Sequence, residues 1–407
     1  MQKLTNQERL KPWMGFVLFF VGLMFLYFIG SYMQTNWGMI GLILTELGFL
    51  AISLLYCVIN KVSIKEVFPI KKITGRDFVG TIFMLIGGFL ANLIAIGISM
   101  LVLSALGQGD ITSEVSGLSD FLYGNKLPYI IIVLIVALTP AICEEAFMRG
   151  AILSSFRGFK RDWGIVLLVG VFFGILHLSP LRFLNTAFLG AILAYIMVKK
   201  NNFLLPMLVH FLNNFLTTIA GVSASGSGTD AAAALDGVSV AVTFGSLLAA
   251  GFLCPLALVI GARLYDKEAV KGKHFAIAGI LSALLLIVGI TTTVVSSMNG
   301  LYSNALLNWN YTFTVDEEAL ECDNLAEAGI EITEVETHTI IVSAVASKAN
   351  ITFTMVDENG EVILNETATG MLMISQTVEL APGHYTLYFT SDDTILGKSF
   401  SYQVIVQ

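Results

Sequence analysis

Three charged residues stand inside a hydrophobic run of the sequence that is long enough to cross a membrane. They are Glu144, Glu145 and Arg149. A charge near the bilayer centre costs about 2.5–3.5 kcal/mol, so such residues usually face a polar cavity and mark a functional site. Glu145 and Arg149 are four residues apart and can pair on one helix face. Glu144 points about 100° away from Glu145 and is left for another partner.

Two further residue pairs with the same spacing, each containing a histidine, occupy later hydrophobic runs. Phe173 and His177 form one, and His210 and Asn214 form the other. Together with Glu144, these residues suit hydrolysis in a confined, wet cavity. A desolvated glutamate can take a proton from water, and a histidine can orient that water or pass on a proton. A His–Asn pair can donate hydrogen bonds to the developing oxyanion.

Taken one at a time, these residues also have structural explanations. A Glu–Arg pair can be a structural ion pair, an intramembrane histidine can cap a backbone carbonyl, and Asn214, like its neighbour Asn213, can join helices. Phe173 fits ordinary packing. The combination favours function, because every polar cluster adds an insertion cost. No serine or cysteine is well placed beside these groups by sequence, although Cys143 adjoins Glu144 and stays open as a nucleophile.

The composition places these residues in a multi-pass membrane protein. Of 407 residues, 56% are hydrophobic and only 13% are charged, which is too apolar for a soluble domain. The sequence shows no clustered basic face of the kind that nucleic-acid binding needs, so we expect no nucleic-acid partner. The four cysteines show no CxxC spacing, which argues against a thiolate zinc site and a disulfide framework. Three stand in apolar runs, and Cys322 stands alone near the C-terminus.

Nine apolar runs can serve as membrane helices, for which about 20 residues are needed. They are residues 14–33, 37–60, 80–106, 129–156, 164–180, 183–198, 203–222, 241–264 and 276–297. The fifth and sixth runs are short, so we expect an all-α multi-pass core of eight or nine transmembrane helices. The first run is too long for the core of a signal peptide, and we interpret it as a retained helix.

Basic residues alternate between the loops that join these runs. They precede the first run and follow the second, fourth, sixth and eighth, whereas the intervening loops carry few. Because basic loops prefer the cytoplasm, we expect a cytoplasmic N-terminus and an extracellular C-terminus. The small and polar residues of segment 223–236 predict a flexible outer loop.

The texture of the sequence changes after residue 300. Seven segments largely alternate apolar with polar residues and are rich in Val, Ile, Thr and aromatic residues, as strands are. They are residues 309–315, 338–345, 350–356, 361–364, 376–380, 384–390 and 399–406. Asn359-Gly360 and Pro382-Gly383 are turn signals between them. The pattern predicts a small all-β, sandwich-like domain outside the cell.

The three intramembrane motifs resemble those of a known family. EExxxR, FxxxH and HxxxN, in this order on successive membrane segments, are similar to the motifs of the CPBP group, the CAAX-protease and bacteriocin-processing (Abi) intramembrane proteases. The resemblance covers residues 80–222. It implies an all-helical membrane core and a glutamate-type peptidase that uses neither a metal nor another cofactor.

The resemblance also implies a role for each motif residue. Glu144 would activate water, His177 would assist it, and His210 and Asn214 would form the oxyanion site. The supporting residues would be Glu145 and Arg149, which maintain the geometry, and Phe173, which lines the cavity. Every motif position is filled, so the pattern predicts an active enzyme.

The runs and the resemblance divide the chain into four parts. These are two N-terminal helices with a basic cytoplasmic loop (1–79), the catalytic core (80–222), an outer loop with two more helices (223–299) and the extracellular domain (300–407). We expect three partners: a peptide or protein substrate, the lipid bilayer, and an envelope ligand of the β domain. An envelope domain without disulfides favours the cell membrane of a bacterium.

Three other functions fit parts of the pattern. A zinc peptidase would use Glu144, His177 and His210 as ligands. A proton-coupled transporter would use the buried charges as a relay, although the sequence shows no inverted repeat. A non-catalytic scaffold or bacteriocin-immunity protein would hold a partner with its membrane core and recognise it with the β domain.

Overall fold

The computed structural model describes residues 9–106, 117, 121–122, 124, 127–226, 240–303, 306–316, 324–392 and 395–407. The chain divides into two compact units, Met1–Val294 and Val295–Gln407, and each is described by itself. Cys322 and most of the predicted outer loop, residues 227–236, lie outside the described residues. The fourfold division of the chain stays a prediction.

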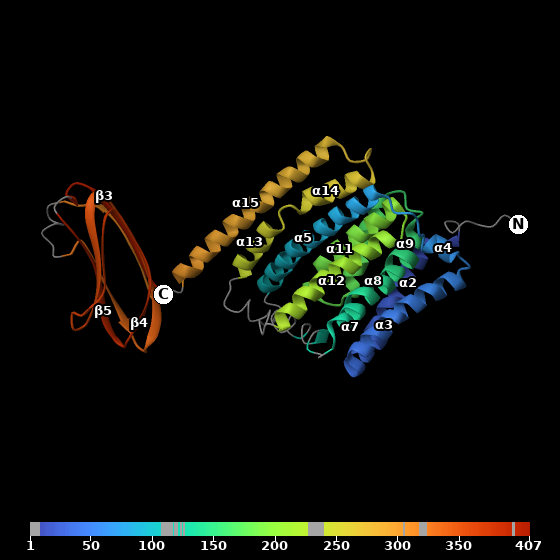
Figure 1. Cartoon of the computed structure of the whole chain (residues 1–407), viewed down its shortest axis with the longest axis horizontal. Coiled ribbons are helices and arrows are strands. Elements are labelled where there is room, and N and C mark those ends of the chain that lie inside the picture. The colour runs from blue at the N-terminus through green and yellow to red at the C-terminus, as the bar shows by residue number, and fades with distance from the viewer. Residues whose placement is uncertain are drawn as a thin grey trace. The chain divides into compact units, whose positions relative to one another are not determined.

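The first unit is helical (Figure 1). Its elements are α2 (Pro12–Met24), η1 (Phe25–Gly30), α3 (Ser31–Ile59), α4 (Ile64–Val67), α5 (Gly75–Ala105), α7 (Tyr129–Val133), η2 (Leu134–Leu138), α8 (Thr139–Glu145), η3 (Ala146–Ile152), α9 (Leu153–Phe156), α10 (Asp162–Leu176), α11 (Pro180–Lys200), α12 (Leu204–Gly226), α13 (Val240–Ala250), α14 (Cys254–Tyr265) and α15 (Gly272–Ser303). The three η elements are wide, π-helical turns. Each of the nine predicted apolar runs falls mainly on these helices.

Within the described residues, seven helical stretches are long and apolar enough to cross a membrane. This number is smaller than nine for two physical reasons. The first two runs join into one stretch, Pro12–Ile59, and the fifth run gives α10, which has only 15 residues. The multi-pass class is therefore supported, while the number of helices that cross the bilayer stays a prediction.

The stretch Pro12–Ile59 is a hairpin that turns at Gly38. Gly38 has φ 55° and ψ −128°, a conformation that is essentially restricted to glycine. Past this turn the chain runs back along itself, since the Thr45 hydroxyl lies 3.5 Å from the Gly30 carbonyl oxygen. The hairpin therefore supplies two neighbouring helices to the bundle.

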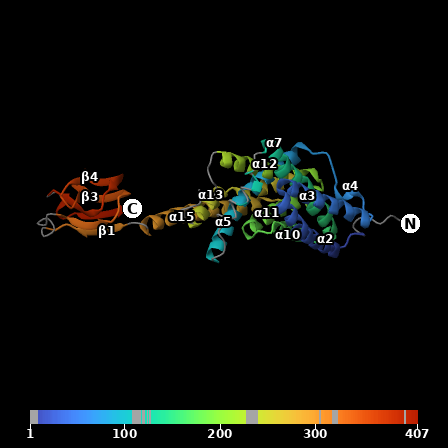
Figure 2. The ribbon, with the colours of Figure 1, turned by 90° about the horizontal axis from the view of Figure 1, so that it is seen from below.

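Helix α11 holds the centre of the first unit. It packs against α5, α10 and α12, and α12 packs in turn against α8 and η2. The N-terminal hairpin also contacts the segment that bears Glu144 and Arg149, because α3 packs against α8 and η3. Figure 2 gives a second view of this arrangement. All three motif-bearing segments are thus held against one another.

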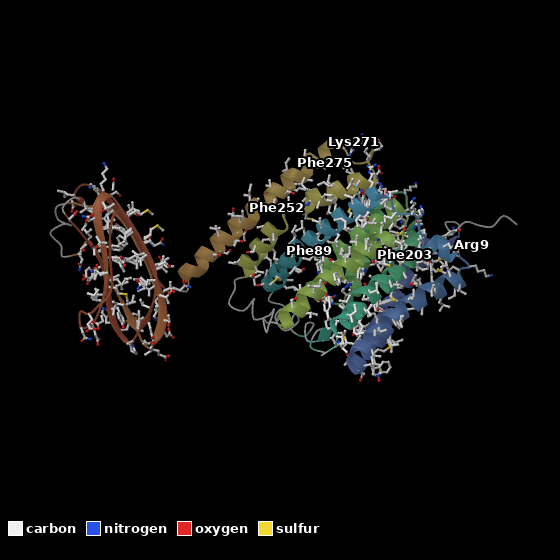
Figure 3. The ribbon with its side chains drawn as sticks, in the orientation of Figure 1. Arg9, Phe89, Phe203, Phe252, Lys271 and Phe275 are labelled. Atoms are coloured by element: carbon white, nitrogen blue, oxygen red, sulfur yellow. The ribbon has the colours of Figure 1, made fainter. Side chains whose placement is uncertain are left out.

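Several basic segments lie at one end of the helical unit. Arg9 donates to the backbone carbonyl of Lys61, and Arg76 donates to that of Arg263 at 2.9 Å. Figure 3 places the labelled Arg9 and Lys271 at the same end. Basic residues from several of the loops that the sequence pattern places on one side of the membrane thus lie at one end of the helical unit.

The second unit is an antiparallel β domain. Its strands are β1 (Leu307–Thr314), β2 (Ala326–Ile332), β3 (Glu336–Asp357), β4 (Val362–Leu380), β5 (Gly383–Ser391) and β6 (Ser399–Val406). They form one sheet in the order β1-β6-β3-β5-β2, and β4 pairs with β3. The all-β prediction is therefore confirmed.

The sheet differs in detail from the predicted sandwich. Strand β4 follows one edge of β3 along its length, while the other edge pairs first with β6 and then with β5. This single sheet folds around a common apolar core and is nearly barrel-shaped. The predicted strands 338–345 and 350–356 are both parts of β3, because the strand continues through a register shift between Val345 and Asn350.

Replacing Gly38 should destabilise the hairpin. In Gly38→Ala the added Cβ disfavours the observed backbone conformation, at a cost of about 1–3 kcal/mol. We expect a lower thermal unfolding midpoint for the purified protein in detergent. Gly279→Ala is the control, because Gly279 lies within α15 and a Cβ there meets no atom within 4 Å. Equal midpoints for the two variants would contradict the described turn.

Candidate active site

A fully buried ion pair lies at the centre of the helical unit. The Nη1 atom of Arg149 donates to Oε1 of Glu145 at 2.8 Å, and both side chains have no exposed surface. The Nη2 atom donates to the carbonyl of Gly190 on α11 at 2.9 Å. The guanidinium also lies over the ring of Phe173, 4.5 Å from its centroid. The pair thus links η3 to both α10 and α11.

His210 on α12 joins the same pair. Its Nδ1 atom lies 2.9 Å from Oε1 of Glu145, so one carboxylate oxygen accepts from both Arg149 and His210. Its Nε2 atom lies 3.9 Å from Oε2 of Glu144. His210 is itself only 2% exposed. A single carboxylate therefore fixes three helical segments, as expected for an intramembrane charge that is paired rather than solvated.

His177 ends α10 and turns toward its own helix. Its Nδ1 atom lies 2.8 Å from the Phe173 carbonyl oxygen, to which a protonated nitrogen donates. In a neutral imidazole, Nε2 then has a free lone pair and accepts hydrogen bonds. This contact is the carbonyl cap that a structural histidine would make, and it also fixes the ring orientation that a catalytic histidine would need.

A cavity of about 280 Å³ is lined by both Glu144 and His177. One water needs about 10–15 Å³ of such volume, so the cavity has room for several. Its lining also includes Arg182 and a second carboxyl, Glu46. The Glu144 side chain is 19% exposed, whereas Glu145 is fully buried. The two adjacent glutamates therefore occupy different environments.

Asn214 lies one turn beyond His210 and is engaged elsewhere. Its amide donates to the carbonyl of Val136 at 3.4 Å and accepts from Asn213 at 3.2 Å. Asn213 in turn accepts from Asn92 on α5 at 3.1 Å. Neither His210 nor Asn214 is among the residues that line the 280 Å³ cavity. The structure thus brings Glu144 and His177 to the cavity and leaves Asn214 beside it.

Two residues of the cavity were missed in the sequence pattern. Glu46 stands in the apolar run 37–60 and Arg182 in the first turn of α11, and neither belongs to one of the three motifs. Glu46 is the only charged residue of run 37–60, and an intramembrane carboxyl is itself a functional signal. That signal could have found Glu46 without a structure.

The geometry does not favour the zinc alternative. Within the described ranges, no group of three or more His, Cys, Asp or Glu side chains converges in a way that could hold a metal ion. Glu144, His177 and His210 were the proposed ligands. The Nδ1 atoms of both histidines contact protein oxygens, so Nε2 is the ring nitrogen that each could offer to a metal.

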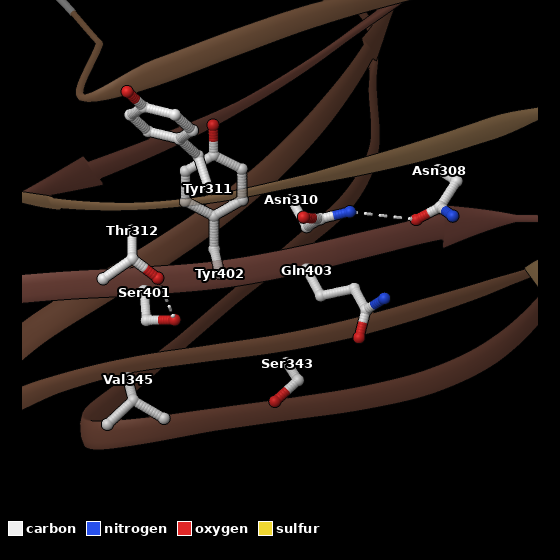
Figure 4. A pocket seen from close by; sticks show the side chains of 9 residues that line it. All are labelled: Asn308, Asn310, Tyr311, Thr312, Ser343, Val345, Ser401, Tyr402 and Gln403. Atoms are coloured by element: carbon white, nitrogen blue, oxygen red, sulfur yellow. Dashed lines mark hydrogen bonds between the residues drawn. The ribbon is translucent and has the colours of Figure 1, made fainter.

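The β domain has a separate polar groove, of about 580 Å³ (Figure 4). Uncharged side chains from β1, β3 and β6 line it, with Tyr311 exposed among them. Two hydrogen bonds organise this surface: Asn310 donates to Asn308 at 3.4 Å, and Thr312 donates to Ser401 at 2.9 Å. The groove is distinct from the membrane site and carries no titratable group except tyrosine.

The helical fold and its buried polar centre define a multi-pass membrane protein with an intramembrane polar site. Residues 126–216 match the family model described as type II CAAX prenyl endopeptidase, Rce1-like. No curated protein and no solved structure matches the chain. The matched segment contains all three motifs and confirms the predicted resemblance to the CAAX-protease family. It indicates a membrane protease, and thus a peptide or protein substrate.

Removing the buried cation should destabilise the helical unit strongly. Arg149→Met leaves the Glu145 carboxylate buried without its partner, and breaking such a pair costs about 3–5 kcal/mol. We expect a marked fall in the thermal unfolding midpoint of the purified protein in detergent. The double variant Glu145→Gln/Arg149→Met removes both charges and should recover part of the loss. An Arg149→Met midpoint equal to that of the wild type would contradict the described network.

Proposed function

We propose that the protein is an intramembrane endopeptidase that cleaves a peptide or protein at the membrane with water activated by Glu144. The observation that carries this proposal is the contrast between two adjacent carboxyls. Glu145 is fully buried and paired with Arg149, whereas Glu144 reaches the cavity that His177 also lines. A carboxyl that faces a cavity with room for water can serve as a general base.

In the proposed reaction, water lies between Glu144 and the Nε2 atom of His177. The Nδ1 atom of His177 is held by the Phe173 carbonyl, so Nε2 can accept one O–H of the water and orient it. Glu144 removes the other proton as the water oxygen attacks the peptide carbonyl. The tetrahedral intermediate then carries an oxyanion that needs hydrogen-bond donors.

We propose His210 and Asn214 as these donors. The Nδ1 atom of His210 donates to Glu145, and Nε2 lies 3.9 Å from the Glu144 carboxyl. To donate to the oxyanion as well, His210 acts as the imidazolium, in which both ring nitrogens carry a proton. The bond from Asn214 to the Val136 carbonyl is long, at 3.4 Å, and a substrate oxyanion would be a stronger acceptor. The residues that support this geometry are Glu145, Arg149 and Phe173.

The proposed topology has a cytoplasmic N-terminus and an extracellular β domain, in a bacterial cell membrane. Its support is the alternation of basic loops in the sequence and the common end at which Arg9 and Lys271 lie. In this orientation a substrate enters from the cytoplasmic half of the membrane. The groove around Tyr311 is the proposed place for an envelope ligand.

Comparing peptide profiles between strains tests the proposal. A deletion strain would express the wild type, Glu144→Gln or His177→Ala at equal membrane abundance. Loss of a general base lowers the rate about 100-fold or more. We therefore expect mass spectrometry of membrane and secreted peptides to find new termini with the wild type that are absent with both variants.

The matched control for this comparison is Glu66→Gln, an exposed glutamate of α4, which should keep the wild-type profile. Identical profiles in all strains would contradict proteolysis. A phenotype that survives Glu144→Gln but requires residues 300–407 would favour the scaffold. Proton-coupled uptake that is lost in Glu144→Gln would favour the transporter.

A further inference from the structure

The cavity beside Glu144 contains a second carboxyl that lies outside all three motifs. Glu46 stands on α3, in the N-terminal hairpin, and not in the segment 126–216 that matches the family model. It is only 4% exposed, and it lines the same 280 Å³ cavity as Glu144 and His177. The packing of α3 against α8 brings the two carboxyls together.

The surroundings of Glu46 leave Glu144 as its main polar neighbour. The two carboxyl groups lie close enough to interact directly, and the Cys143 thiol is also nearby. The Oε2 atoms of both Glu46 and Glu144 are buried without a hydrogen-bond partner within the described part of the chain. Within that part of the chain, Glu46 forms no ion pair of 4.0 Å or less.

Two buried carboxyls that face each other cannot both be ionised without a large repulsive cost. A proton held between them removes the repulsion and converts it into a hydrogen bond. The positive groups of the site are placed differently. Arg149 is bound to Glu145 and to the Gly190 carbonyl, and Arg182 lines the cavity together with both carboxyls. The Nε2 atom of His210 lies 3.9 Å from Oε2 of Glu144, a contact that Glu46 lacks among the described residues. Glu144 is thus the carboxyl with cationic support, and Glu46 is the one suited to carry the proton.

We propose that Glu46 and Glu144 form a carboxyl pair that holds one proton, and that Glu46 is the proton donor of the site. The catalytic half of this inference rests on the proposed protease function. His177 does not replace Glu46 in this role. When its Nδ1 proton is given to the Phe173 carbonyl, the neutral ring has no proton at Nε2 to donate.

The pair allows a balanced hydrolytic cycle. Ionised Glu144 takes one proton from water as the oxygen forms a bond to the peptide carbonyl carbon. Protonated Glu46 gives its proton to the amide nitrogen as the C–N bond breaks, which releases an amine and a carboxylic acid. The proton on Glu144 then passes to Glu46 across the hydrogen bond between them. One water is consumed, and the pair returns to its starting state.

Infrared spectroscopy of the purified protein tests the pair without any substrate. A buried protonated carboxyl gives a C=O stretching band that an ionised carboxylate lacks. At neutral pH we expect this band in the wild type, its loss in Glu46→Gln, a shifted band in Glu144→Gln and no change in Glu66→Gln. A wild type without the band, or a band that persists in Glu46→Gln, would overturn the pair.

Kinetics with a peptide cleaved by the wild type test the donor role. Gln can keep the hydrogen bond to Glu144 but cannot release a proton, so a merely positioning residue would tolerate Glu46→Gln. We expect kcat to fall about 100-fold, as for loss of a general acid, with KM nearly unchanged. Unchanged kcat would overturn the donor role. If the wild type cleaves nothing while the infrared result holds, the protease proposal and the donor role fail together and the pair stands.

Discussion

The high cost of charge in a membrane is the constraint on which the rest of this structure depends. Glu145 and Arg149 offset that cost by pairing in a fully buried position. Two further hydrogen bonds tie this pair to other helices. Arg149 donates to the carbonyl of Gly190 on α11, and His210 on α12 contacts the same oxygen of Glu145. The segment that bears the pair is therefore held rigidly. Its neighbour Glu144 lines the cavity instead.

Wide helical turns on either side of Glu144 contribute to this arrangement. The π-helical turns η2 and η3 flank α8, and such turns often occur at functional sites. The Val136 carbonyl in η2 accepts from Asn214, and Thr139 donates to the Leu134 carbonyl at 2.7 Å. The residue four positions after Val136 is Pro140, which has no N–H, so the Asn214 side chain supplies a donor that a regular helix would lack there. The Thr139 hydroxyl adds a second donor to the Leu134 carbonyl, which already accepts from the Thr139 N–H. The same contacts place Asn214 close to the site without exposing it to the cavity.

Much of the membrane core could be predicted from the sequence, because apolar runs and intramembrane charges are strong signals. The pairing of Glu145 with Arg149 was expected from their spacing and is present, whereas the contact of His210 with Glu145 was not expected. Glu46 was missed because a single carboxyl has no motif around it. Its partner is almost a hundred residues away, so only the packing of the hairpin shows that the two carboxyls meet.

The β domain was only partly predictable from local patterns in the sequence. Its class and some strand boundaries were predictable from alternation, as the predicted segment 399–406 coincides with β6. Strand β2 was missed, because Ala326–Ile332 contains glycine, alanine and glutamate, which are depleted in strands. Lys348 has φ 58° in the irregular stretch of β3, and this local bulge cannot be told from a turn by composition alone.

Chelation of a purified, active preparation tests the central claim most directly, namely that protein carboxyls rather than a metal activate water in the membrane. The protein would be reconstituted in lipid vesicles with a peptide that it cleaves, before and after removal of metals. The account predicts unchanged cleavage after chelation and a loss of about 100-fold or more in Glu144→Gln. Cleavage that stops on chelation and returns with added zinc would contradict it.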